Sequence, residues 1–326
     1  MMGLMQKARA FIGAKAPAPA WPPRFLSLAL QGGGSFGAFT WGVLDRLLEE
    51  REVDFDAISG ASAGAVNAVL LASGMIEGRA EAKARLERFW KRMSHAASFL
   101  PTTSPAAAAL GGGFSLFPRL SPYLVNPFDL NPLREALAAE IDFEKLRAQS
   151  PVKLLIGATR VRDGSLRIFR ESELSVESVL ASACLPLIHH TVEVEGEPYW
   201  DGGYVANPPL IPLVLASEAD NVLVVQVTPA KAERLPTTLR EIVRRLDQIN
   251  FNSTLNAEIA ALKLAKSLSP TPRLRRLRID RISAQDEIEG LADENAANLG
   301  WDFLQRLRDS GRSAAQAWIA QPAAQP

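Results

Sequence analysis

The chain has 326 residues, which is enough for one large domain or two small ones. Hydrophobic residues make up 47% and charged residues 22%, values typical of a globular protein. Lys plus Arg and Asp plus Glu number 36 each, so net charge predicts no basic face and argues against a nucleic-acid partner. A single cysteine, Cys184, excludes an internal disulfide, and metal-ligand spacing of Cys or His is absent. We therefore expect no metal and no cofactor.

Residues 1–23 lack the apolar core and cleavage pattern of a signal peptide and are predicted to form a flexible leader and linker. Their first twelve residues have one apolar helical face, which leaves contact with a membrane surface open. No apolar run reaches the roughly 20 residues of a membrane-spanning helix. A cytoplasmic location, with or without peripheral membrane contact, is the expectation.

Two strand–turn–helix units follow, with their turns about 25 residues apart, the length of one βα repeat. The first unit is a strand over residues 25–30, a glycine turn, and a helix over residues 38–51. The second is a strand over residues 55–59, a serine turn, and a helix over residues 65–72. The two turns are where we expect the chemistry.

The serine turn, Gly60-Ala61-Ser62-Ala63-Gly64, fits the pattern G-x-S-x-G between a strand and a helix, which is typical of a nucleophile elbow. Side chains at positions 60 and 64 would collide across such a sharp turn, and both are glycine. The Ser62 hydroxyl would then lie at the N-terminus of the next helix, which favours a developing oxyanion. The alternative is an ordinary serine in a glycine-bounded loop, and the flanking strand and helix favour the elbow.

The glycine turn also fits a dinucleotide-binding pattern through Gly32, Gly34 and Gly37. That site needs an acidic residue at the end of the next strand, whereas Asp56 lies at its start. A P-loop is excluded because no Gly-Lys-Ser/Thr follows.

We favour a loop formed by Gly32, Gly33 and Gly34 whose N–H groups point at an acyl oxygen near Ser62. A tight turn without chemistry is the alternative.

Residues 77–94 are predicted to form a surface helix with a core-facing stripe. Residues 95–131 are rich in Pro, Ala and Gly yet contain many large apolar side chains. A long irregular segment in a compact domain is usually functional or disordered, and the apolar content argues against simple disorder. We expect a mobile lid or acyl-chain wall, with a buried excursion as an equal alternative.

The second half alternates further strands and helices. Strands are predicted over residues 152–159, 165–169, 221–227 and 273–283, and a hairpin over 191–199. Helices are predicted over 176–183 and 298–320, with one or two helices over 234–268. Residues 321–326 would be a loose tail. No internal repeat is present, so we predict one domain over residues 24–320.

A serine hydroxyl needs a base to take its proton, and the chain has three histidines, His95, His189 and His190. In the order Ser, Asp or Glu, His, either His189 or His190 could complete a triad with an acid such as Asp163. Both histidines could equally be structural.

The second candidate base is the acid of Asp201-Gly202-Gly203, which follows the predicted hairpin. Glycines beside an acid allow close backbone approach, and a partly desolvated Asp201 could act directly as general base. An Asp-Gly hairpin turn is the structural alternative. From the residues alone, these two readings are even.

Taken together, several motifs occur in a family-specific order: Gly32-Gly33-Gly34-x-x-Gly37, Gly60-x-Ser62-x-Gly64, Ala181-Ser182 with Pro186, and Asp201-Gly202-Gly203 followed by Asn207-Pro208. This combination, over residues 26–212, resembles the patatin-like phospholipases. The resemblance implies a three-layer α/β/α fold with a mostly parallel central sheet, and lipid acyl hydrolysis without a metal through an acyl-enzyme.

The resemblance further implies a Ser–Asp dyad in which Ser62 is the nucleophile and Asp201 the base. It implies an oxyanion hole in the glycine-rich loop, with Gly33 and Gly34 as the preferred donors. The substrate would be a lipid or acyl ester.

One residue departs from the family pattern. Many members have a basic or polar residue where this chain has Phe36, which weakens the inference of a phospholipid head group. Two rivals stay open: a Ser-His-Asp esterase using His189 or His190, and a non-catalytic lipid-binding protein on the same fold. The oligomeric state is open.

Overall fold

The computed structural model describes residues 21–98, 121–126, 129–290 and 296–321. Within them lies a sheet of eight strands: β1 (Phe25–Leu30), β2 (Asp54–Gly60), β3 (Lys153–Arg160), β4 (Leu166–Arg170), β5 (Val192–Val194), β6 (Glu197–Asp201), β7 (Asn221–Gln226) and β8 (Arg278–Ser283). The strand order is β5-β6-β3-β2-β1-β7-β8, with β4 also paired to β3. The pairings β3–β2, β2–β1, β1–β7 and β7–β8 are parallel. The pairings β3–β4, β3–β6 and β5–β6 are antiparallel.

The α-helices are α2 (Gly37–Leu47), α3 (Ala63–Met75), α4 (Arg79–Ser98), α6 (Pro122–Val125), α7 (Pro132–Glu140), α8 (Phe143–Gln149), α9 (Val176–Ser182), α10 (Leu210–Ala216), α11 (Leu239–Leu268), α12 (Pro272–Arg276), α13 (Gln285–Gly290) and α14 (Trp301–Ile319). Short 3₁₀ turns follow β1, β4 and β6 at Gly34–Phe36, Glu171–Glu173 and Gly202–Tyr204.

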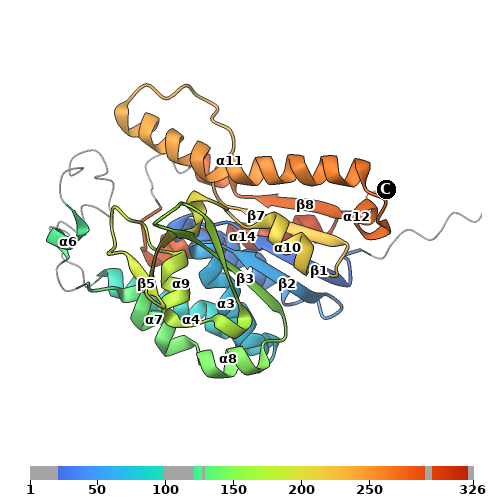
Figure 1. Cartoon of the computed structure of the whole chain (residues 1–326), viewed down its shortest axis with the longest axis horizontal. Helices are drawn as coiled ribbons and strands as arrows, with labels where there is room; N and C mark the ends of the chain where they lie inside the picture. Colours follow the sequence, from blue (N-terminus) through green and yellow to red (C-terminus); the bar gives the residue numbers. More distant parts are fainter. Residues whose placement is uncertain (1–20, 99–120, 127–128, 291–295, 322–326) are drawn as a thin grey trace, which may run out of the picture.

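The sheet is buried between two layers of helices (Figure 1). The alternation of side chains along β1 shows this directly, because Leu28 and Leu30 face one apolar cluster and Ala29 faces the other. The first cluster includes side chains of α2, α3 and α14, and the second includes those of α10 and α11. The predicted three-layer, mostly parallel α/β/α architecture is therefore confirmed.

Helix α14 packs very closely against α2. A Cβ on Gly42 would lie 1.9 Å from the carbonyl oxygen of Arg308, and one on Gly311 would lie 2.1 Å from that of Phe39. The backbones of the two helices can approach this closely only because both positions lack a side chain. The C-terminal helix thus covers the same face of the sheet as the first helix of the chain.

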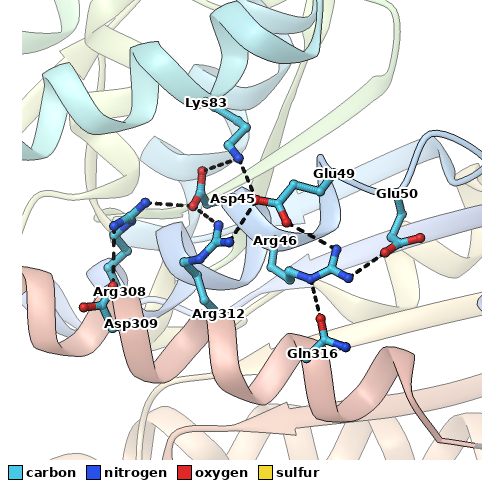
Figure 2. Close-up of polar contacts among 9 residues, drawn as sticks. All are labelled: Asp45, Arg46, Glu49, Glu50, Lys83, Arg308, Asp309, Arg312 and Gln316. Carbon is cyan, nitrogen blue, oxygen red and sulfur yellow. Dashed lines mark hydrogen bonds and ion pairs between the residues drawn. The ribbon is translucent and has the colours of Figure 1, made fainter.

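Polar contacts also join these helices (Figure 2). The carboxylate of Asp45 in α2, whose side chain is 4% exposed, contacts Lys83 of α4 and both Arg308 and Arg312 of α14. Glu49, in the turn just after α2, also contacts Lys83 and Arg312. Helices α2, α4 and α14 are therefore joined through one acidic residue of α2 and one that directly follows it.

Helices α7, α8, α10 and α13 were not predicted, and one predicted strand differs from the structure. Residues 273–283 were expected to be one strand, but they begin as helix α12, and β8 starts only at Arg278. Pro272 suits the first turn of a helix, and pairing with β7 becomes available only where Arg278 lies opposite Asn221. Within residues 234–268, where one or two helices were expected, Leu239–Leu268 form the single helix α11, which begins with a capping box of Thr238 and Glu241.

Other expectations lie wholly or partly outside the described residues. The leader before residue 21 and the tail after residue 321 are among them, as are residues 99–120 and 127–128 of the expected lid. The lid thus stays a prediction. No helix among the described residues is long and apolar enough to cross a membrane.

Candidate active site

The site begins at the turn between β2 and α3. Ser62 has φ 54° and ψ −129°, a conformation that costs a non-glycine residue energy and that is typical of functional positions. A Cβ on Gly60 would lie 2.6 Å from the backbone of Gly64, and one on Gly64 would lie 2.0 Å from the carbonyl oxygen of Leu30. This turn therefore requires glycine on both sides of the serine.

Helix α9 holds the backbone of this turn. The N–H of Ser62 donates to the carbonyl oxygen of Ser182 at 3.0 Å and approaches its hydroxyl at 3.2 Å. The Ser182 hydroxyl in turn donates to the carbonyl oxygen of Gly157 in β3 at 2.6 Å. The strained turn is thus tied to the sheet through a fully buried serine of α9.

The register of β3 explains how Asp201 reaches Ser62. Residues 155–156 of β3 pair with both β2 and β4, and residues 158–159 pair with both β4 and β6. β6 therefore occupies the same edge of β3 as β2, beyond the point where β2 ends at Gly60. Because β6 runs antiparallel to β3, its last residue, Asp201, points back toward the end of β2 and the serine turn.

The carboxylate of Asp201 is fully buried. Its Oδ1 accepts a hydrogen bond from the N–H of Gly203 at 2.7 Å, while Oδ2 makes no hydrogen bond of ordinary geometry with the described residues. Burial raises the pKa of Asp201 to about 7, although the Gly203 N–H and the nearby Ser62 hydroxyl both act to lower it. The carboxyl can therefore gain and lose a proton near neutral pH, which suits a general base.

The glycines after Asp201 allow this close packing. A Cβ on Gly202 would lie 2.1 Å from the carbonyl oxygen of Gly157, and one on Gly203 would lie 2.4 Å from the ring of Phe251 in α11. The same Cβ on Gly203 would also lie 3.0 Å from Oδ1 of Asp201. Side chains at either position would displace the carboxylate or the helix beside it.

The glycine-rich loop lies directly against the serine. A Cβ on Gly32 would lie 2.5 Å from Cβ of Ser62, and one on Gly37 would lie 2.7 Å from Cβ of Ala63. Gly34 has φ 59°, and a side chain there would meet the carbonyl oxygen of Ala296. The loop can thus approach the nucleophile only as glycine.

The N–H groups of this loop are not equivalent. That of Gly32 donates to Oδ1 of Asn207 at 2.8 Å and is occupied. Those of Gly33 and Gly34 donate to no acceptor among the described residues, nor does the N–H of Ala63, directly after the nucleophile. The N–H groups of Gly33, Gly34 and Ala63 are therefore available to donate to an oxyanion.

A buried amide network supports the loop, and the sequence analysis did not identify it. Gln31 accepts from the N–H groups of Val227 and Thr228 at 3.0 and 2.8 Å and donates to Oδ1 of Asn252 at 3.1 Å. Together with Asn207, these side chains fix the glycine loop against β7 and α11. The only sequence signal was the pair Asn207-Pro208, because buried amides have no distinctive spacing.

His190 makes its contacts with residues other than Ser62. The ring of His190 stacks on Tyr123 at 4.1 Å, and its Nδ1 lies 3.9 Å from the carboxylate of Asp129. Burial lowers the pKa of His189. Among the described residues, no histidine makes a hydrogen bond with Ser62, and Asp163 accepts from Ser165 in the exposed turn after β3.

The remaining candidates have structural roles. The carboxylate of Asp56 accepts hydrogen bonds from Ser217 and from the backbone after it, so it fixes the end of α10. Phe36 packs toward Phe303 of α14, with ring centroids 6.4 Å apart. Burial raises the pKa of the Cys184 thiol to about 12, which leaves it unreactive. Among the described residues, no group of three or more His, Cys, Asp or Glu could hold a metal.

Comparison with known proteins gives a family. The model of the family described as patatin-like phospholipase matches residues 28–214, more than half of the chain. No curated protein matches.

Three solved structures are similar in fold. VipD from Legionella pneumophila is 16% identical, with a TM-score of 0.46, covering 92% of this chain and 67% of that one. The type III effector ExoU is 16% identical, with a TM-score of 0.40, covering 94% and 55%. ExoU in its heterodimeric complex with SpcU, from Pseudomonas aeruginosa, is 20% identical, with a TM-score of 0.36, covering 92% and 68%. The chain spans about two thirds of the length of the VipD chain and about half of the length of the ExoU chain.

Proposed function

The chain belongs to the patatin-like phospholipase family, a family of lipid hydrolases, and from this premise we propose that it is a metal-independent serine acyl hydrolase acting on lipid esters through an acyl-enzyme. The observation that carries the proposal is the strained Ser62 beside a fully buried Asp201 whose pKa lies near 7. A hydroxyl needs a neighbouring base to become a nucleophile, and this carboxyl is the titratable group that faces it.

In the first half of the reaction, the Ser62 hydroxyl attacks the ester carbonyl and its proton passes to Asp201. The carbonyl oxygen becomes an oxyanion, which the N–H groups of Gly33, Gly34 and Ala63 are available to bind. Collapse of the tetrahedral intermediate breaks the ester bond. Asp201 returns the proton to the leaving alcohol, and the acyl group stays on Ser62.

In the second half, Asp201 takes a proton from a water molecule, which attacks the acyl-enzyme. The same oxyanion site serves again, and Ser62 regains its proton as the fatty acid leaves. No histidine is needed for either proton transfer, because the pKa of Asp201 already lies near neutral pH.

The proposal predicts both covalent labelling and a pH dependence. A fluorophosphonate probe should add one phosphonyl group to Ser62, located by mass spectrometry of peptides, and Ser62→Ala should stay unlabelled. The rate of hydrolysis of a soluble ester, as kcat/KM, should rise with pH through about 7 as Asp201 loses its proton. Labelling on another residue, or a rate independent of pH between 5 and 9, would contradict the dyad.

A further inference from the structure

Helix α11 exposes a row of large apolar side chains, which we name the α11 stripe: Leu239, Ile242, Leu246 and Ile249. Their exposed fractions lie between 40 and 63%. They recur at intervals of three and four residues, so they lie on one face of the helix. Large exposed side chains gathered on one face differ from isolated surface leucines and indicate an interaction surface.

The stripe does not serve the fold. The face of α11 that packs on the sheet is provided further along the helix by Leu255, Ile259 and Leu262, all buried. The stripe residues belong to neither buried apolar cluster. Because they stay 40 to 63% exposed, these four side chains gain little of the stabilisation that full burial would give.

Helix α11, which carries the stripe, passes beside the proposed site. Phe251, two residues after Ile249, has its ring 2.4 Å from the place of a Gly203 Cβ, two residues from Asp201, and lies on the opposite face of the helix from the stripe. The first half of α11 projects over the end of the molecule toward which β1 and β2 run, and α6 lies at the same end (Figure 1). Leu124 of α6 and Leu187, three residues after Cys184, are also more than 60% exposed.

The charge beside the stripe is positive. Residues 231–245 contain five basic residues and two acidic ones, whereas the whole chain contains 36 of each. One of the two acids, Glu241, is occupied as an acceptor for the N–H groups of Thr237 and Thr238 at the start of the helix. Such a segment attracts a negatively charged partner.

We propose that the α11 stripe, with Leu124 and Leu187 beside the same site, is the surface by which this protein docks on an anionic lipid membrane. This inference rests on the proposed function, since it places the lipid substrate and the dyad on one side of the molecule. A second copy of the chain fits less well. The stripe extends over 11 residues, about one and a half heptads, whereas a coiled coil requires three or four.

The test uses vesicles of phosphatidylcholine with about 30% phosphatidylglycerol, because the negative lipid supplies the charge that the basic segment would bind. Binding is measured by co-flotation in a Ser62→Ala background, so that the vesicles are not hydrolysed. The stripe variant is Ile242→Glu with Leu246→Glu. The matched control is Leu264→Glu with Leu268→Glu, two exposed positions at the other end of the same helix. Circular dichroism confirms folding of each.

We expect the stripe variant to bind these vesicles at least about tenfold more weakly, because two inserted side chains are lost, while the control binds as the parent does. With Ser62 present, the stripe variant should hydrolyse a soluble short-chain ester at the parent rate. Equal binding by both variants, or equal binding to vesicles of phosphatidylcholine alone, would overturn the inference.

Two further outcomes separate this inference from the proposed function. If the parent is inert on every ester but its vesicle binding depends on the stripe, the docking surface stands and the hydrolase does not. If the parent is a dimer that the stripe variant converts to a monomer without change in vesicle binding, the stripe is a subunit interface and the inference is wrong.

Discussion

The buried carboxyl of Asp201 makes the folded protein sensitive to pH in an unusual direction. The pKa of Asp201 is raised from 3.8 to about 7, so the unfolded chain releases this proton at lower pH than the folded protein does. The contribution of this group to stability is therefore full below pH 4 and is lost as pH rises through about 7. The fully charged form destabilises the fold by roughly 4 kcal/mol, at 1.36 kcal/mol for each unit of pKa.

Replacing Asp201 with Asn should consequently stabilise the protein, and more so at high pH. Asparagine keeps the shape and the acceptor for Gly203 but carries no charge. The gain in the free energy of unfolding should grow by about 2.6 kcal/mol between pH 5 and pH 8, as read from urea unfolding of both proteins. A gain that is constant with pH would show that the folded protein already carries the ionised carboxylate throughout this range, so that burial does not raise its pKa.

The second residue-scale prediction concerns the backbone of Ser62. Its φ of 54° and ψ of −129° suit glycine, whereas alanine would keep the strain of the serine. The free energy of unfolding of Ser62→Gly should therefore be about 1 kcal/mol higher than that of Ser62→Ala, although both variants lack the nucleophile. The comparison uses chemical denaturation of the two variants, and an alanine variant as stable as the glycine one would show that the turn is relaxed.

At the scale of elements, Asp45 of α2 and Glu49 just after it hold together helices from both ends of the described chain (Figure 2). Asp45 is nearly inaccessible, yet it faces three cations on α4 and α14. Removing one partner of a buried charge group leaves the others uncompensated, which costs more than the interaction itself contributes.

Asp45→Asn should lower the free energy of unfolding by about 3–5 kcal/mol. Asp309→Asn is the matched control, because Asp309 also contacts Arg308 but is 70% exposed at its side chain. We expect the control to change the free energy of unfolding by less than about 1 kcal/mol. Similar losses in the two variants, measured by thermal or urea unfolding, would show that Asp45 is not the centre of this group.

Several elements could be predicted from local pattern, and others could not. The continuous apolar run of β7 and the Glu195-Gly196 turn between β5 and β6 both lie where the sequence indicated them. Helix α12 was missed because Pro272 acts there as a first-turn residue rather than as a break before a strand. The length of α11 as a single helix depends on packing at Leu255 and Ile259, which periodicity in a half-exposed helix does not reveal.

The proposed site likewise has residues that the local sequence predicts and residues that it does not. The glycines around Ser62 could be predicted because a sharp turn has a local sequence requirement. The partner of Ser62 could not be chosen from the residues alone, since Asp201 reaches it through the register of β6 on β3, a long-range feature. The preference for Asp201 over His189 and His190 came from the family resemblance, and the dyad itself stays a proposal.

At the scale of the whole molecule, the sheet and its two helix layers bring the proposed chemistry to one end. The turns after β1 and β6 both reach the serine turn after β2, and α11 passes beside the turn after β6. Figure 1 shows the first half of α11 projecting over this end of the molecule. The family match ends at residue 214, yet α11 and α14 both lie beyond it. One of these helices supports the glycine loop through Asn252 and the other packs on α2, so the later part of the chain completes the site and the core.

The most direct test of the central claim is metal-free hydrolysis of short- and long-chain p-nitrophenyl esters and of phospholipid vesicles. The parent protein would be compared with Ser62→Ala, Asp201→Asn and a double His189→Ala, His190→Ala variant, each checked for folding. We predict an active parent, a loss of at least about a thousandfold in kcat for the first two variants, and retained activity in the third. An Asp201→Asn variant that keeps its activity while the histidine variant loses it would contradict the dyad and favour a Ser-His-Asp triad.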